Sequence, residues 1–208
     1  MADAERAGPM VVGPVTLEGR LVRLEPLARG HLDGLCAAGL QGDVFGWMPT
    51  PIDSREEMAA WVDAALEAQA AGTALPLATV ETGSGRVVGA TRFLAIEPAH
   101  RRLEIGWTWV GRPWQRTPIN TEAKLLMLRH AFETLGANRV ELKTDALNAP
   151  SRAAILRLGA AEEGTFRSHM ILPGGRVRDT VYYSLIAPEW PAVRDRLGAM
   201  LDRPWPRP

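Results

Sequence analysis

The sequence lacks the features that mark several large classes of protein. It has one cysteine, Cys36, in 208 residues, which excludes an internal disulfide. Its four histidines show no spacing typical of a zinc site, and we expect no metal. Its 24 Lys and Arg residues balance 24 Asp and Glu residues. This balance argues against nucleic-acid binding through a general basic field, but it does not exclude binding through a local basic patch.

Long hydrophobic runs are missing as well. No stretch approaches the roughly 20 apolar residues that cross a membrane as a helix. The N-terminus carries Asp3 and Glu5 where a secretory signal peptide would be basic, and no sustained apolar run follows them. We therefore expect a soluble, cytoplasmic protein without a membrane partner.

The length and the pattern of elements predict a single domain. We expect a flexible tail over residues 1–14, one folded domain over residues 15–202 and an extended, proline-rich end over residues 203–208. Periodicity and turn residues predict strands at residues 21–24, 75–81, 86–95, 102–110, 139–145, 163–172 and 177–186. They predict helices at residues 28–40, 54–71, 118–135, 150–158 and 189–201. The expected fold is α+β, with a mixed sheet and helices on both faces.

The most informative stretch is a strand, a loop and a long helix between Arg101 and Lys124. The strand shows the two-residue alternation of a half-buried strand. Thr117 followed by Pro118 predicts an N-cap and a first helical residue. A loop that turns into a helix leaves unpaired N–H groups at the positive end of the helix dipole, which suits a phosphate. Most such helix ends hold only water, and no Walker or dinucleotide motif is present here, so this alternative stays open.

Three segments of the chain read EIGWTWVGRPWQRTPINTEAKLLMLRHAFE, ELKTDALNAPSRAAILRLGA and RDTVYYSLIAPEW. They resemble the GNAT N-acetyltransferase superfamily, specifically its RimJ/RimL-like branch, and the similarity covers about residues 17–192. It implies a GNAT-type, mostly antiparallel sheet with helices on both faces and two splayed parallel strands, at residues 102–110 and 139–145. The superfamily's pyrophosphate loop, Q/R-x-x-G-x-G/A, corresponds to Gln115–Asn120, where both glycines are replaced.

The resemblance implies that acetyl-CoA lies between the two splayed strands, with its pantetheine arm along the first of them. The residues expected to contact it are Gly106, Trp107, Thr108, Trp109, Gln115, Arg116, Thr117, Ile119, Asn120, Thr121, Asn148 and Ser151. A glycine in a strand permits close approach of another chain, although it equally fits a β-bulge.

Transfer of an acetyl group to an amine requires a proton acceptor, because an alkyl amine with a pKa of about 10 is almost fully protonated at neutral pH. We assign this role to Glu104, expected on the same strand face as Gly106 and Thr108; the alternative is an ordinary solvated glutamate. The resemblance places Asn148 on the CoA arm and Ser151 at the thiolate, and both residues could simply cap a helix. It also places Trp47 and Met48 at the acceptor pocket, where they could instead anchor their loop.

The resulting prediction is an enzyme that transfers the acetyl group of acetyl-CoA to a primary amine by direct attack in a ternary complex. The acceptor is a protein N-terminus or a small-molecule amine. One alternative is a non-catalytic acyl-CoA-binding module of the same fold, and another is an interaction protein that uses the Pro/Trp end. A homodimer remains open.

Overall fold

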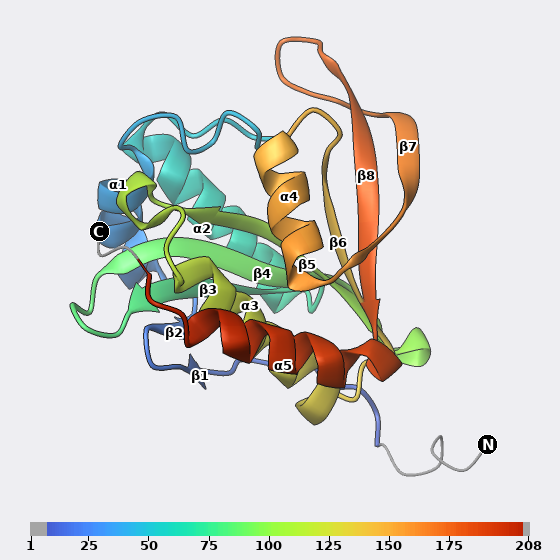
Figure 1. Ribbon diagram of the computed structural model, residues 1–208. Coiled ribbons are helices and arrows are strands. Elements are labelled where there is room, and N and C mark those ends of the chain that lie inside the picture. The colour runs from blue at the N-terminus through green and yellow to red at the C-terminus, as the bar shows by residue number, and fades with distance from the viewer. Residues whose placement is uncertain (1–7, 206–208) are drawn as a thin grey trace.

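The computed structural model describes residues 8–205 and has an eight-stranded sheet with helices on both faces (Figure 1). The strand order is β1-β2-β3-β4-β5-β6-β8-β7. The strands are β1 (Leu17–Glu18), β2 (Val22–Pro26), β3 (Ala74–Glu81), β4 (Val87–Glu97), β5 (Arg102–Val110), β6 (Arg139–Asp145), β7 (Ala161–Ile171) and β8 (Val177–Ile186). The α-helices are α1 (Leu32–Gly39), α2 (Arg55–Ala70), α3 (Ile119–Arg129), α4 (Ala149–Leu158) and α5 (Trp190–Leu201). The short helices are η1 (Arg29–His31), η2 (Pro98–His100), η3 (Arg112–Trp114), the π-helical η4 (His130–Thr134) and η5 (Ala187–Glu189).

The sheet is antiparallel except at β5 and β6, which run parallel. These two strands pair only from Arg102–Arg139 to Glu104–Glu141. Beyond that point they have no register with each other, although both strands continue. The predicted α+β architecture with two splayed parallel strands is therefore confirmed.

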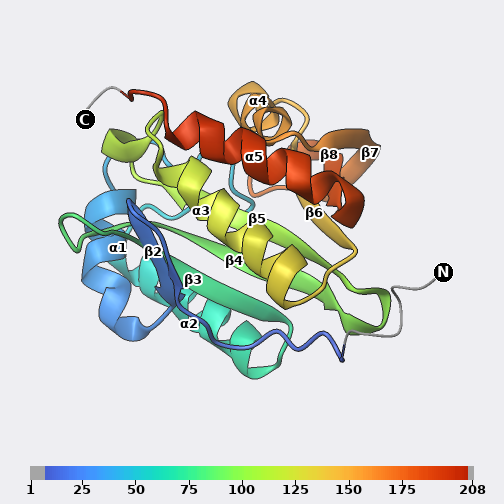
Figure 2. The same ribbon diagram turned by 60° about the horizontal axis from the view of Figure 1, so that its bottom comes forward.

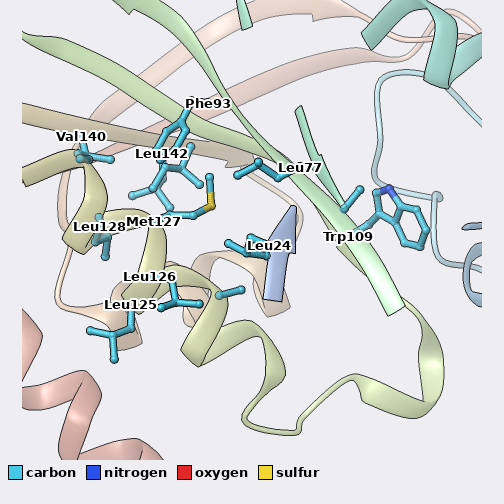
Figure 3. Packing of buried hydrophobic residues seen from close by; sticks show 14 of the residues in the cluster. Leu24, Leu77, Phe93, Trp109, Leu125, Leu126, Met127, Leu128, Val140 and Leu142 are labelled. Atoms are coloured by element: carbon cyan, nitrogen blue, oxygen red, sulfur yellow. The ribbon is translucent and has the colours of Figure 1, made fainter. Parts of the chain in front are cut away.

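Helices α1 and α2 cover one face of the sheet, and α3 and α5 cover the other (Figure 2). Every residue of helix α3 from Thr121 to Leu128 is buried. The reason is that α5 packs on the side of α3 that faces away from the sheet. A helix enclosed in this way is apolar around much of its circumference. Its leucines and Met127 pack with Phe93, Val140 and Leu142 of the sheet (Figure 3).

Some element boundaries differ from the predicted ones. The predicted helix at 28–40 divides into η1 and α1, and the two-residue strand β1 was not predicted. Helix α3 begins at Ile119 with Pro118 as its N-cap, so the assignment of the cap to Thr117 is wrong by one residue. The cause is local: the Thr117 hydroxyl donates to the Trp114 carbonyl at 2.6 Å, and Glu122 N makes the first helical bond to Pro118 O.

The two ends of the described chain lie against the domain. Met10, in the predicted N-terminal tail, is 3 % exposed, and Trp205 Nε1 donates to the Met200 carbonyl at 2.9 Å. The outer parts of the predicted tails, residues 1–7 and 206–208, lie outside the described residues. Between residues 8 and 205 no helix is both long and apolar enough to span a bilayer.

Candidate active site

Strand β5 contains a β-bulge next to the point where it leaves β6. Arg92 pairs with Gly106 and Ala90 pairs with Trp109, so two steps along β4 face three along β5. Trp107 adopts the left-handed conformation, with φ of 50°. Because β6 has diverged here, the edge of β5 that faces β6 has no strand partner. Its N–H and C=O groups can therefore pair with an extended ligand, as an added strand would.

The bulge changes which side chains share a face. Thr108 Oγ1 lies 2.8 Å from Thr91 Oγ1 and accepts a hydrogen bond from Lys124 Nζ of α3 at 2.6 Å. Gly106 is paired with Arg92, whose guanidinium instead lies over Trp61 of α2. The expectation that Thr108 shares a face with Glu104 and Gly106 is therefore wrong, because the extra residue in β5 reverses the alternation.

Gly106 makes room for the carboxylate of Glu104. A Cβ atom at position 106 would lie 2.7 Å from Glu104 Oε1 and 3.1 Å from Leu94 Cδ2. Real Cβ contacts are not that short, so any larger residue would displace the carboxylate. The lack of a side chain at position 106 thus leaves the space that the Glu104 carboxylate occupies. The bulge begins at the next residue.

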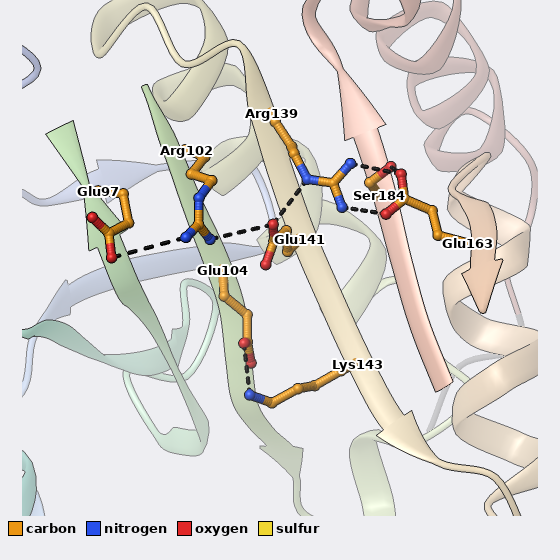
Figure 4. A network of polar contacts seen from close by, with 8 residues as sticks. All are labelled: Glu97, Arg102, Glu104, Arg139, Glu141, Lys143, Glu163 and Ser184. Carbon is orange, nitrogen blue, oxygen red and sulfur yellow. Dashed lines mark hydrogen bonds and ion pairs between the residues drawn. The ribbon is translucent and has the colours of Figure 1, made fainter. Parts of the chain in front are cut away.

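Glu104 is a buried carboxylate that faces one ammonium group (Figure 4). It is 3 % exposed, and its Oε2 lies 2.9 Å from Lys143 Nζ of β6. Burial raises the pKa of Glu104, and Lys143 offsets part of that rise. A carboxylate with a raised pKa is a better proton acceptor near neutral pH than a solvated one. The alternative of an ordinary solvated glutamate does not fit this burial.

A row of ion pairs links β5, β6 and β7 on the side where β5 and β6 still pair, and Ser184 of β8 donates a hydrogen bond to Glu163 in this row (Figure 4). Arg102 Nη1 lies 3.4 Å from Glu141 Oε1, which Arg139 Nε contacts at 2.8 Å. Arg139 also pairs with Glu163, and this hydrogen bond lowers the pKa of Glu163 to about 2. These contacts fix the point from which the two strands diverge.

The loop before α3 presents unpaired amides. Arg116 has a left-handed φ of 61°, and Gln115 Nε2 donates to the Val110 carbonyl at 3.0 Å. Among the described residues, the backbone N–H groups of Arg116, Thr117, Asn120 and Thr121 have no hydrogen-bond partner. Free amides at the start of a helix can bind an anion, and these four are present although both glycines of the family's loop are replaced.

Two of the predicted loop side chains are not available to a ligand. Ile119 is 5 % exposed, and Thr121 is fully buried and accepts a hydrogen bond from Arg157 Nη2 at 3.2 Å. Arg157 belongs to α4 and was not predicted as a site residue. It lines a pocket of about 630 Å³ together with Arg196, Arg203, Met200, Pro204 and Trp205. Arg157 therefore links the first turn of α3 to a pocket that it lines together with Arg196 of α5 and Arg203, which follows α5.

The start of α4 combines a cap with a free hydroxyl. Asn148 Oδ1 accepts from Ser151 N at 3.1 Å, so Asn148 caps the helix as its alternative assignment predicted. The Ser151 hydroxyl has no hydrogen-bond partner in residues 8–205 and is partly exposed. Its oxygen is therefore free to bind a ligand.

The loop between α1 and α2 meets the β7–β8 turn through Trp47. The guanidinium of Arg176 lies 5.9 Å from the Trp47 ring and also contacts Asp145 at the end of β6, at 2.5 Å. Trp47 is 42 % exposed, whereas Met48 packs against the core. Trp47 thus lies partly exposed against the β7–β8 turn, and the packing of Met48 fits its alternative role as an anchor of the loop.

Lys124 of α3 is a buried amine without an acidic partner in the described chain. It is 4 % exposed and donates to the hydroxyls of Thr108 and Thr91, at 2.6 and 3.2 Å. Burial lowers its pKa to about 7. The folded protein therefore holds Lys124 neutral in a pH range where the unfolded chain keeps it protonated, up to a pKa of about 10.4.

This difference predicts that stability rises with pH above about 7, since the unfolded state binds more protons there. Relative to Lys124→Met, the free energy of unfolding should rise by up to about 1.4 kcal/mol per pH unit between about pH 7 and 9. Urea denaturation of both proteins at several pH values measures the difference. Parallel pH profiles for the two proteins would show that Lys124 is protonated in the folded state.

Comparisons with known proteins agree with this geometry. The family model "Acetyltransferase (GNAT) domain" matches residues 21–161. YdaF of Bacillus subtilis, whose name describes it as a ribosomal N-acetyltransferase, is 34% identical over 106 residues, which are 51% of this chain and 57% of YdaF. The chain thus matches little more than half the length of this curated relative.

Solved structures match over a longer span. A GCN5-related N-acetyltransferase from Brucella melitensis is 36% identical, with a TM-score of 0.87 over 95% of this chain and 90% of that one. RimJ from Mycobacterium smegmatis, in complex with CoA-disulfide, shares the fold, with a TM-score of 0.77 at 23% identity over 96% of this chain and 100% of that one. From the family match and these relatives we conclude that the chain belongs to the GNAT acetyltransferase family.

Proposed function

We propose that this protein transfers the acetyl group of acetyl-CoA to a primary amine by direct attack in a ternary complex. The observation that carries the proposal is the unpaired edge of β5 beyond Glu104, which continues toward the free amides before α3. The strand edge suits the amide groups of a pantetheine arm, and the amides suit a pyrophosphate. The RimJ relative, which shares this fold, is in complex with CoA-disulfide.

The phosphates of acetyl-CoA are assigned to the start of α3 and the arginines beside it. Arg157 donates a hydrogen bond to Thr121 in this turn, and it lines a pocket together with Arg196 and Arg203. Cationic side chains that flank a helix N-terminus add to the attraction of its dipole for anions. Arg116, Thr117, Asn120 and Thr121 then act through their free backbone N–H groups. The N–H groups of Gln115 and Ile119 already donate to Arg112 O and Thr117 Oγ1, so these two residues mainly shape the loop.

Glu104 is assigned to the proton of the acceptor amine. The amine must lose that proton before attack, which costs about 4 kcal/mol at neutral pH for a pKa near 10. Glu104 is buried beside Gly106 and Trp107, where the thioester carbonyl is expected. We expect amides of the bulge to polarise that carbonyl. Lys143 favours the ionised form of the carboxylate and offsets part of the rise in pKa that burial causes, so Glu104 can accept the proton directly or through a water.

Ser151 is assigned to the departing thiolate, with Asn148 beside the CoA arm. Ser151→Ala removes the free hydroxyl and leaves the cap intact, because Asn148 bonds the backbone amide of residue 151. We expect kcat to fall by about tenfold, with an unchanged dissociation constant for acetyl-CoA. Steady-state kinetics and calorimetry measure the two effects. An unchanged kcat would leave Ser151 with a capping role only.

Two measurements separate this function from the alternative of a non-catalytic acyl-CoA-binding module. Calorimetry with acetyl-CoA should show binding at tens of micromolar or tighter, and an absence of binding would exclude both. Thiol release over a panel of amines then distinguishes enzyme from module: an enzyme releases CoA faster with at least one acceptor present. Release that no amine accelerates would favour the module.

A further inference from the structure

Arg92 of β4 is a buried arginine without an acidic partner. Its side chain is 8 % exposed, and its guanidinium carbon lies 4.9 Å from the ring centroid of Trp61 and 4.8 Å from that of Trp107. Across residues 8–205 no carboxylate forms an ion pair or a hydrogen bond with it. Burial lowers the pKa of Arg92 to about 10, and no acidic group raises it again. A guanidinium buried without an anion is unusual, because proteins pair most buried charges.

Two further buried donors lack a partner: one belongs to Trp61, which the guanidinium contacts, and the other to Trp109, whose ring lies next to that of Trp61. Arg92 Nε, Trp61 Nε1 and Trp109 Nε1 are buried without a hydrogen-bond partner in the described chain, where Gln69 Oε1 is the one other such atom. The rings of Trp61 and Trp109 lie 6.4 Å apart. All three atoms of the cluster donate and none accepts. Since buried polar groups are nearly always hydrogen-bonded, the cluster fits a ligand that brings acceptors.

The cluster adjoins the expected site of acetyl transfer and lies away from the expected phosphate site. Arg92 pairs with Gly106, over which the carboxylate of Glu104 folds. Paired Cα atoms in antiparallel strands are about 4.5–5.5 Å apart, so Glu104 and Arg92 flank one glycine. Thr91, the neighbour of Arg92, instead contacts Lys124 of α3. Arg92 therefore faces α2, on the side of the sheet opposite α3.

We propose that Arg92, Trp61 and Trp109 form an anion subsite in the acceptor pocket, and that the acceptor is an amine that also carries a carboxylate. The amine half of this inference rests on the proposed acetyl transfer, whereas the anion half stands on the cluster alone. The planar edge of a guanidinium whose faces meet two indole rings matches a carboxylate. One arginine supplies one positive charge, which suits a carboxylate better than a phosphate of charge near −2. Amino acids and their small derivatives carry both groups within a short distance.

The anion half can be tested without catalysis. In this experiment sodium acetate replaces sodium chloride stepwise in the protein solution, at constant ionic strength. Tryptophan fluorescence and the midpoint of thermal unfolding are the readouts. The wild type should respond saturably in the millimolar range, and Arg92→Gln should weaken the response at least tenfold. Arg129→Gln, the same change at an exposed arginine, should leave it unchanged. If Arg92→Gln does not fold, Trp61→Phe keeps a ring and removes one donor, and should weaken acetate binding.

The amine half is tested with pairs of acceptors that differ only at the carboxylate, such as phenylalanine and phenylalaninamide. Thiol release is normalised to the neutral fraction of each amine. We expect kcat/KM to be at least tenfold higher for the carboxylate member with wild type, and this preference to disappear in Arg92→Gln. Equal rates for both members, without acetate binding, would overturn the anion subsite and leave acetyl transfer standing. Acetate binding without acetylation of any amine would instead support the subsite and contradict the proposed function.

Discussion

Replacement of Glu104 by glutamine is expected to lower kcat by about 10²- to 10³-fold, the usual contribution of a positioned general base. The side chain keeps its size, so the space over Gly106 stays filled, but the amide no longer accepts the proton of the acceptor. The dissociation constant for acetyl-CoA should change little, because Glu104 is assigned to the amine and its partner is Lys143. Steady-state kinetics with a saturating amine, together with calorimetry on acetyl-CoA, measures both quantities.

The pH dependence gives a second readout for Glu104. Since burial raises the pKa of Glu104, the acid limb of the kcat profile should lie above the range of a solvated glutamate. Glu104→Gln should lose this limb, and the exposed Glu67→Gln in α2 should retain both the limb and the rate. A Glu104→Gln protein with the full rate would remove Glu104 from the mechanism.

Loss of the Glu122 side chain should destabilise the protein more than other single changes on α3. Glu122 is 4 % exposed, and its carboxylate accepts hydrogen bonds from the backbone amides of Arg20, Leu21 and Val22, at 3.1, 2.6 and 2.8 Å. Glu122→Ala leaves three amides without their acceptor. The expected loss is about 3–5 kcal/mol of unfolding free energy. For a chain of this size, that lowers the thermal midpoint by about 8–15 °C.

Urea denaturation of Glu122→Ala and Glu122→Gln measures this effect against Glu67→Ala on the exposed side of α2. The glutamine keeps one acceptor oxygen and should lose less stability than alanine. The Glu67 control should stay within about 0.5 kcal/mol of wild type. If Glu122→Ala unfolds like the control, the turn between β1 and β2 is held by other contacts.

Sequence patterns predicted the fold because the alternation at 102–110, the turn residues and the apolar spacing of the helices act locally. The prediction that β5 and β6 splay apart came from the family resemblance, since no local pattern encodes a loss of strand pairing. The apolar–polar alternation did not predict the bulge at Trp107, and for that reason Thr108 was assigned to the wrong face of the sheet. Likewise, Gly106 gave no sign that it accommodates the carboxylate of Glu104.

Three residues that the structure singles out carried a weak signal in the sequence. Arg92 lies in the mostly apolar segment VVGATRFLAI, and Glu122 and Lys124 lie in the buried stretch TEAKLLML. A charge within an otherwise apolar element suggests a specific partner. The partners themselves come from elsewhere in the chain: Trp61 for Arg92, Thr91 for Lys124, and the amides after Gly19 for Glu122. Sequence spacing alone could not have identified them.

A crystal structure of the protein with acetyl-CoA or CoA tests the central claim most directly. We predict that the pantetheine arm hydrogen-bonds to the free edge of β5 between Ile105 and Val110, and that the pyrophosphate contacts the amides of residues 116–121. A nucleotide bound elsewhere, with the space between β5 and β6 filled by the protein's own side chains, would contradict the account.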